Sequence, residues 1–259
     1  MEIIKFNLSS KSCILRKSDS NDIYFSYSII HKIAVLGILG AIIGEEGYNQ
    51  KNLKIEFGKE KKSLPNFYNN LKSLKIAIEP NTYKTFFKIQ TFNNSVGYAS
   101  NEEGKNLVVN EQWLENPNWN IYILDDDSEY YKKIKKYLKN SECEYIPYIG
   151  KNDHFANISE FEILSGEKVK DNNKINSINS IFADINYKIL DSIDALLLGF
   201  DIDSDVKFEK KEVLPTELDD DIGYINYKKF IYTNKNIKVE DDLNFQKIYN
   251  VKDKVIVFF

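Results

Sequence analysis

Residues 29–44 read Ile-Ile-His-Lys-Ile-Ala-Val-Leu-Gly-Ile-Leu-Gly-Ala-Ile-Ile-Gly. Almost every residue in this stretch is apolar or glycine, which predicts a buried helix over 29–43. Gly37, Gly40 and Gly44 recur at spacings of three and four residues, so they lie on or near one face of that helix. Glycines at this spacing permit a helix to pack closely on a sheet, at a cost in helix propensity of about 1 kcal/mol each.

The sequence on both sides of this helix predicts the rest of a split βαβ unit. Alternating polar and apolar residues predict strands, and an amphipathic stretch with acidic residues first and lysines last predicts a second helix. The predicted strands are 2–8, 74–79, 84–91, 107–109, 119–124 and 158–164, with a further possible strand at Leu53–Phe57, and the second helix is 126–140. The main order of strand, helix, strand, strand, helix, strand predicts an α+β fold with a ferredoxin-like (RRM-like) βαββαβ domain.

Two further segments complete the predicted organisation. Residues 92–107 are polar, contain glycine and are long for a hairpin tip, which is typical of a functional arm. We therefore expect an extended β-hairpin thumb at about 80–118, within a first domain of residues 1–164. Residues 165–259 alternate acidic turns with short apolar segments and are predicted to be a variable, β-rich C-terminal region.

The charge of the chain is unevenly distributed. The formal net charge is −4, yet residues 1–100 carry 14 Lys and Arg against 8 Asp and Glu, a balance of +6, and the remainder is acidic. The first hundred residues are therefore expected to meet a polyanion, although the acidic whole argues against a free-standing, nonspecific nucleic-acid binder. Two cysteines, no signal peptide and no membrane-length apolar run predict a cytoplasmic protein with no membrane contact.

Residues 145–157, Tyr-Ile-Pro-Tyr-Ile-Gly-Lys-Asn-Asp-His-Phe-Ala-Asn, concentrate donors and flat aromatic faces in one loop. Gly150 allows a positive φ or a close approach of the backbone to a ligand. This composition suits a phosphate backbone or an unstacked base. Composition alone also fits a plain turn that opens the next strand.

Motifs of known catalytic chemistry are absent from the sequence. Only His31 and His154 exist, and there is no zinc-deaminase signature, Walker loop or nucleophile elbow. The clusters 125–127 and 219–221 lack the spacing of a calcium-binding loop and are explained by helix caps and turns, so no metal and no cofactor is predicted. Metal-free RNA cleavage stays open as an alternative, with His31 or His154 assisted by Tyr24, Tyr27 or Lys32.

Three places in the chain resemble the Cas-five family of CRISPR-associated proteins. Residues 29–44 look like the Gly-containing first helix of that family, and the arm at 92–107 stands where the family has its thumb. Pro-Tyr-Ile-Gly-Lys-Asn-Asp-His-Phe at 147–155 is similar to the family's Pro-Tyr-x-Gly-Lys-x-Glu-Phe loop. The likeness covers about residues 1–165, and its overall style is closest to the type I-B branch.

The resemblance implies a non-catalytic subunit of a type I CRISPR Cascade that caps the 5′ handle of the guide RNA (crRNA) in antiviral defence. The implied partners are the crRNA, the backbone subunit and the large subunit, with target DNA reached only through the complex. Arg16, Lys17 and Lys32 are the expected phosphate contacts, and Tyr24, Tyr27 and His31 the expected stacking or hydrogen-bonding residues. Asn93, Asn94, Tyr98 and Lys105 would belong to the thumb, and Tyr148, Gly150 and Lys151 would line the handle loop. A repeat-cleaving endoribonuclease of the same superfamily is the alternative.

Overall fold

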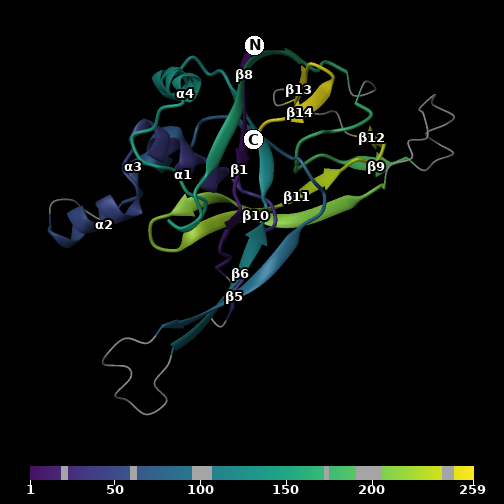
Figure 1. Ribbon diagram of the computed structural model, residues 1–259. Helices are drawn as coiled ribbons and strands as arrows, with labels where there is room; N and C mark the ends of the chain where they lie inside the picture. Colours follow the sequence, from purple (N-terminus) through teal and green to yellow (C-terminus); the bar gives the residue numbers. More distant parts are fainter. Residues whose placement is uncertain (19–22, 59–62, 95–106, 172–174, 191–205, 241–247) are drawn as a thin grey trace.

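The computed structural model describes residues 1–259 except 19–22, 59–62, 95–106, 172–174, 191–205 and 241–247. The fold is α+β, as the sequence predicted. The helices gather on one face of a sheet, the short C-terminal strands lie toward the other, and a two-stranded arm extends away from the body (Figure 1).

A six-stranded antiparallel sheet forms the centre of the molecule, in the order β14-β13-β8-β1-β7-β4. Its strands are β1 (Glu2–Ser9), β4 (Ile76–Pro80), β7 (Asn118–Leu124), β8 (Asn157–Lys168), β13 (Ile248–Val251) and β14 (Lys254–Val257). Side chains alternate along β1, so that Ile4, Phe6 and Leu8 enter the main core. The predicted strands at 2–8, 74–79, 119–124 and 158–164 thus lie side by side in this sheet.

Four helices are described: α1 (Lys32–Ile43), α2 (Tyr48–Glu56), α3 (Asn66–Leu71) and α4 (Glu129–Asn140). The first begins three residues later than predicted, because His31 is its N-cap and accepts a hydrogen bond at Nδ1 from the Ala34 amide at 3.2 Å. Ser128 caps α4 in the same way through Tyr131 N–H.

The glycines of α1 face a helix instead of the sheet. A Cβ at Gly40 would lie 2.5 Å from Phe67 Cβ in α3. A Cβ at Gly37 would lie 3.8 Å from the ring of Phe67. Gly44 ends the helix with a φ of +79°. Helix–helix contact, not helix–sheet contact, is therefore what the small residues permit.

The possible strand at Leu53–Phe57 is wrong, because this segment belongs to α2. Its alternation of apolar and polar residues is outweighed by helix formers such as leucine, lysine and glutamate. Gln50 Oε1 also accepts the Gly47 amide hydrogen at 2.8 Å and so fixes the start of the helix.

The arm is formed by β5 (Phe86–Asn94) and β6 (Leu107–Glu115), paired antiparallel along their full length. The base of β6 is also paired with β2 (Ser12–Cys13) and, in parallel, with β3 (Ile23–Tyr24). The segment between β1 and α1 therefore contributes two short strands that hold the arm to the body.

The C-terminal region is rich in strands; it contributes to two cores shared with the first half and forms a further core of its own. It contains β9 (Tyr187–Ile189), β10 (Glu209–Asp219), β11 (Gly223–Thr233) and β12 (Ile237–Val239) in addition to β13 and β14. Leu214, Leu218 and Phe230 of the β10–β11 hairpin lie in the main core with α1. The chain end also pairs with the sheet, since Ile76 and Phe259 exchange backbone hydrogen bonds at 3.1 and 2.9 Å.

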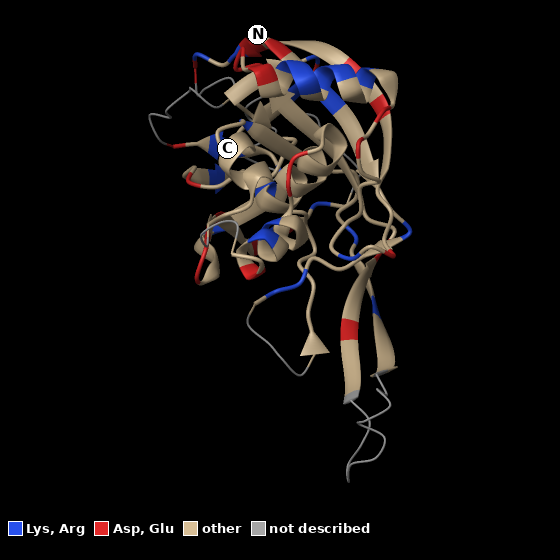
Figure 2. Cartoon of the chain, turned by 90° about the vertical axis from the view of Figure 1, so that its left-hand side faces the viewer, with Lys and Arg blue, Asp and Glu red and all other residues tan. Residues whose placement is uncertain are grey.

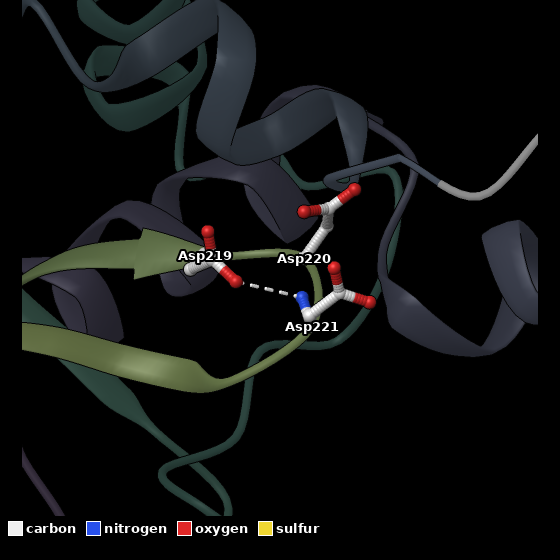
Figure 3. Close-up of side chains that lie close together, drawn as sticks. All are labelled: Asp219, Asp220 and Asp221. Carbon is white, nitrogen blue, oxygen red and sulfur yellow. Dashed lines mark hydrogen bonds between the residues drawn. The ribbon is translucent and has the colours of Figure 1, made fainter.

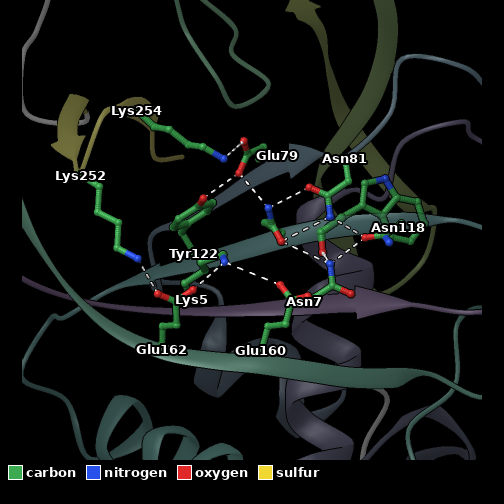
Figure 4. Close-up of polar contacts among 12 residues, drawn as sticks. Lys5, Asn7, Glu79, Asn81, Asn118, Tyr122, Glu160, Glu162, Lys252 and Lys254 are labelled. Atoms are coloured by element: carbon green, nitrogen blue, oxygen red, sulfur yellow. Dashed lines mark hydrogen bonds and ion pairs between the residues drawn. The ribbon is translucent and has the colours of Figure 1, made fainter.

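The sheet face opposite the helices is occupied by an internal polar network (Figure 4). Glu79, buried within it, accepts hydrogen bonds from Asn120, from Tyr122 Oη at 2.7 Å and from Lys254 Nζ at 2.6 Å. These groups satisfy one another, and the strands β13 and β14 cover the neighbouring apolar part of this face.

Candidate nucleic-acid interface

A groove with a volume of about 980 Å³ runs over the outer face of α1. Its floor is made of small and apolar residues of that helix, including Ala34, Gly37 and Ala41. Residues 14–18, the start of α2 and residues 145–151 form its walls. Its size is near the upper end of the range, about 300–1,000 Å³, that is typical of small-ligand pockets.

The groove brings together residues that are far apart in the sequence. Seven of the thirteen predicted contacts line it: Arg16, Lys17, Tyr24, His31, Tyr148, Gly150 and Lys151. The two predicted clusters, before α1 and in the 145–157 loop, thus meet at one surface.

Arg16 is the best presented cation of the groove. Its guanidinium lies 3.6 Å from the centre of the Tyr24 ring, and the residue is exposed. Stacking on an aromatic face leaves the N–H groups at the edge of the guanidinium for a phosphate or a base. Lys17 also lines the groove, but its Nζ is 3.7 Å from Glu212 Oε1.

Lys151 is held by a buried carboxylate. Its Nζ donates to both oxygens of Glu111 at 3.0 Å and lies 4.8 Å from the Phe92 ring centre on the arm. Glu111 also accepts from Trp113 Nε1 at 2.8 Å. The lysine therefore fastens the 145–157 loop to the base of the arm, and its charge is largely used within the chain.

Residues 145–157 form a tight turn that also lines the groove. Ile149 N–H donates to His154 O at 2.9 Å and Ala156 N–H to Pro147 O at 3.0 Å. Gly150 has a φ of +87°, and a Cβ there would lie 1.7 Å from the carbonyl oxygen of Ile14. The glycine therefore permits a backbone–backbone approach, whereas the ring of Tyr148, 44% exposed, is offered to the groove.

His31 and Tyr27 are buried instead of presented to a ligand. Tyr27 is 3% exposed, and its ring meets the His31 imidazole edge to face at 5.5 Å. Burial lowers the pKa of His31 to about 3, so its imidazole is neutral at physiological pH and serves as a helix cap. The ring of Tyr27 packs in the core and is not presented to the groove, and its expected stacking role stays a prediction.

The remaining predicted contacts lie away from the groove or outside the described residues. Lys32 points toward the end of the chain, where its Nζ donates to the carbonyl oxygen of Phe259 at 3.1 Å. Asn93 is exposed on β5, and Asn94 is the last residue of that strand. Tyr98 and Lys105 fall outside the described part of the chain, so their predicted roles stay predictions.

The groove residues that sequence reasoning missed include Tyr48, Gln50, Tyr145 and Tyr224. Tyr48 and Tyr145 are about half exposed, and Gln50 Nε2 donates to Tyr145 Oη at 3.2 Å. Tyr145 opens the loop quoted above and was within reach of sequence reasoning. Tyr48 and Gln50 were not predicted because the helix that carries them, α2, was not predicted. Tyr224 belongs to the β10–β11 hairpin, whose position is defined only by the tertiary fold.

His154 is packed against the arm. It is 2% exposed, its Nδ1 is 3.0 Å from Ser12 Oγ, and its ring meets Trp113 edge to face at 4.4 Å. Burial lowers its pKa, which also favours the neutral imidazole.

The acidic cluster Asp219, Asp220 and Asp221 forms the tip of the β10–β11 hairpin (Figure 3). Asp219 Oδ1 accepts the backbone N–H groups of Asp221 and Ile222 at 2.8 and 3.0 Å. Turn formation accounts for this cluster, as the sequence indicated.

Basic and acidic residues are interspersed along the chain in Figure 2, and lysines gather on α4. The positive balance of the first hundred residues is partly neutralised by the acidic remainder. Lys5 Nζ lies 2.8 Å from Glu162, and Lys17 is near Glu212. None of the helices in the described ranges has the length and apolar character needed to cross a membrane.

No family model matches the sequence, and no curated protein matches it. Several solved structures are similar at low identity. A chain of a CRISPR RNA-guided surveillance complex aligns over 91% of both chains with 10% identity and a TM-score of 0.47. A CRISPR protein from Archaeoglobus fulgidus aligns over 99% of this chain and 98% of its own, again with 10% identity and a TM-score of 0.47. A Cas protein aligns with 12% identity and a TM-score of 0.35 over 58% of this chain, which spans only 57% of that protein.

Proposed function

We propose that this protein is a non-catalytic, RNA-binding subunit of a CRISPR ribonucleoprotein complex, and that the groove over α1 holds a single-stranded segment of the guide RNA. The observation that carries the proposal is the convergence of Arg16, Tyr24, Tyr148 and the rim tyrosines on one groove. Single-stranded RNA is held by cations that meet phosphates and by aromatic rings on which bases stack. An apolar floor with exposed tyrosines at the rim fits this ligand class.

The finer assignment follows the family resemblance in the sequence. It places the protein in a type I-B Cascade, where it caps the 5′ handle of the crRNA and contacts the backbone and large subunits. The order β8-β1-β7-β4, antiparallel throughout and flanked by α1 and α4, supports the ferredoxin-like interpretation. The arm formed by β5 and β6 stands where the thumb of that family is expected.

The surroundings of both histidines support the non-catalytic assignment. A general acid or base must reach the reacting hydroxyl group and hold a pKa near the working pH. His31 has a pKa of about 3 and uses Nδ1 as a helix cap, and His154 is enclosed by Ser12 and Trp113.

The binding test is the affinity of the full-length chain for a CRISPR-repeat RNA, followed by fluorescence anisotropy. Arg16→Glu removes the exposed guanidinium, so we expect the affinity to fall roughly tenfold or more. The slope of the logarithm of the binding constant against the logarithm of salt concentration should become smaller in magnitude by about 0.7. Tyr148→Ala removes a stacking face worth about 1–3 kcal/mol per base, with little change in that slope.

Lys136→Glu is the matched control for Arg16→Glu. It makes the same change of charge on the exposed side of α4, away from the groove. Equal losses for the two variants would reduce the interaction to nonspecific electrostatics and overturn the groove assignment.

The nuclease alternative has a separate test. The chain is incubated with repeat RNA in the presence of a chelator, and the products are separated on a denaturing gel. We expect intact RNA. Site-specific cleavage that His31→Asn or His154→Asn abolishes, with folding preserved, would replace the non-catalytic assignment.

A further inference from the structure

A second cavity, the arm-base cavity, adjoins the groove where β5 and β6 leave the body. It has a volume of about 590 Å³ and shares Lys17 with the groove as a lining residue. Its other walls come from residues 25–28, from the chain leading into β5, from β6 and from β10. The arm-base cavity therefore continues the groove toward the arm.

The charge balance of the arm-base cavity favours an anion. Lys210 of β10 donates to the Thr85 hydroxyl, and no carboxylate in the described part of the chain lies within ion-pair distance of its Nζ. The one acidic residue of the lining, Glu212, is already used: it accepts from Ser28 N–H, from Ser28 Oγ at 2.7 Å and from Ile29 N–H at 3.0 Å. Two lysines thus face a single carboxylate whose oxygens are engaged by the loop before α1.

Burial makes the cation at Lys210 costly. It lowers the pKa of this lysine, with Glu212 acting in the opposite direction. A phosphate next to Nζ would stabilise the charged form and offset part of the desolvation.

Aromatic side chains stand beside this lysine. Phe25 and Phe87 line the arm-base cavity and are 38% and 40% exposed. Tyr83, also in the lining, is stacked on Phe208 at 4.9 Å and so is held in place. Flat apolar faces within a cationic cavity match an unstacked base joined to a phosphate.

We propose that the arm-base cavity binds one unstacked nucleotide of the RNA strand that occupies the groove, with a phosphate at Lys210 and the base against Phe25 or Phe87. This inference rests on the proposed function, since it extends the path of the same strand. It assigns a binding role to β10, a strand of the C-terminal region, and to the base of the arm.

The test uses two neighbouring lysines on one strand. Lys210→Gln removes the cavity cation, whereas Lys211→Gln changes a lysine that is about half exposed, outside the cavity lining and paired with Glu209 at 2.5 Å. Affinities of the full-length chain for single-stranded repeat RNA are measured at several salt concentrations. We expect weaker binding and a log–log slope smaller by about 0.7 for Lys210→Gln, and wild-type values for Lys211→Gln.

Two further variants separate charge and stacking from folding. Lys210→Arg keeps the charge and should retain the slope, while Phe87→Ala should weaken binding without changing the slope. Thermal unfolding identifies a variant that fails to fold, in which case Lys210→Arg and Phe87→Ala carry the test.

The outcomes distinguish this inference from the proposed function. Suppose that Lys210→Gln and Phe87→Ala keep the wild-type slope and affinity while Arg16→Glu loses binding. This result would overturn the nucleotide site in the arm-base cavity and leave the groove assignment intact. Absence of RNA binding by the wild-type chain would overturn both.

Discussion

Gly150 shows how a residue in a binding loop can be required for the backbone alone. Its φ is +87°, and the carbonyl oxygen of Ile14 would lie 1.7 Å from a Cβ at this position, so there is room only for hydrogen. The sequence indicated a glycine that lets the chain approach something closely. It could not indicate that the neighbour is the wall of the groove, because residues 14 and 150 meet only in the tertiary fold.

Gly150→Ala is expected to destabilise the protein by more than about 3 kcal/mol, since backbone strain of about 1–3 kcal/mol is added to a steric overlap. Gly223→Ala is the matched control: its φ is +88° and a Cβ there would meet nothing within 4 Å. Chemical denaturation of both variants measures the difference. Equal losses of unfolding free energy would contradict the close contact with Ile14.

His31 makes stability depend on pH in a defined direction. Its pKa in the folded protein, about 3, lies below the value of about 6.5 expected in the unfolded chain. Between these values the unfolded state binds one proton more, so stability falls as the pH drops below about 6.5, by up to about 1.4 kcal/mol per pH unit.

His31→Asn keeps a good N-cap and removes the titrating group. We therefore expect a shallower loss of unfolding free energy between pH 6.5 and 4 than in the wild type, whatever the variant's stability at pH 7. Urea denaturation at each pH measures both slopes. Identical slopes would show that His31 does not titrate as a buried neutral cap.

At the scale of elements, the helix α1 was easy to predict from the sequence, whereas the neighbours that each of its faces contacts were not. Its apolar sequence predicts a helix that is largely buried, with Leu36, Leu39 and Ile42 toward the core. The same uniformity hides which face meets the sheet, which meets α3 and which is left as the floor of the groove. Periodicity cannot separate faces that carry the same kind of residue.

Two glycines of α1 are expected to respond differently to alanine. Gly40→Ala brings a Cβ to 2.5 Å from Phe67 Cβ, so α3 must move and the protein should lose about 1–3 kcal/mol. Gly37→Ala meets Phe67 at an ordinary 3.8 Å and gains helix propensity, so stability should be unchanged or rise by up to about 1 kcal/mol. The order of the two thermal midpoints decides between this packing and a glycine face turned toward the sheet.

At the scale of the whole molecule, the acidic C-terminal region completes the fold of the first half. Glu212 binds the loop before α1 and Leu214 enters the core beneath it, while Phe259 pairs with the edge of the sheet at Ile76. The strands β1, β4, β7 and β8 were predictable from periodicity in 1–164. The position of 165–259 was not, because its short strands are specified by contacts with distant residues and not by local patterns.

This arrangement also explains why the charge asymmetry of the sequence overstated the basic surface. Lys5 is paired with Glu162 and Lys17 with Glu212. Lys32 Nζ donates a hydrogen bond to the carbonyl oxygen of Phe259. Within the two cavities, the groove offers Arg16 and the arm-base cavity offers Lys210.

Photo-crosslinking of the full-length chain to a repeat RNA that carries 5-iodouridine tests the central claim most directly. Mass spectrometry then identifies the crosslinked residues. The groove assignment predicts crosslinks at Tyr148, Tyr145 or Tyr48, abolished when Arg16→Glu prevents binding. Crosslinks confined to exposed aromatic residues outside the groove, such as Phe57 after α2, would contradict it.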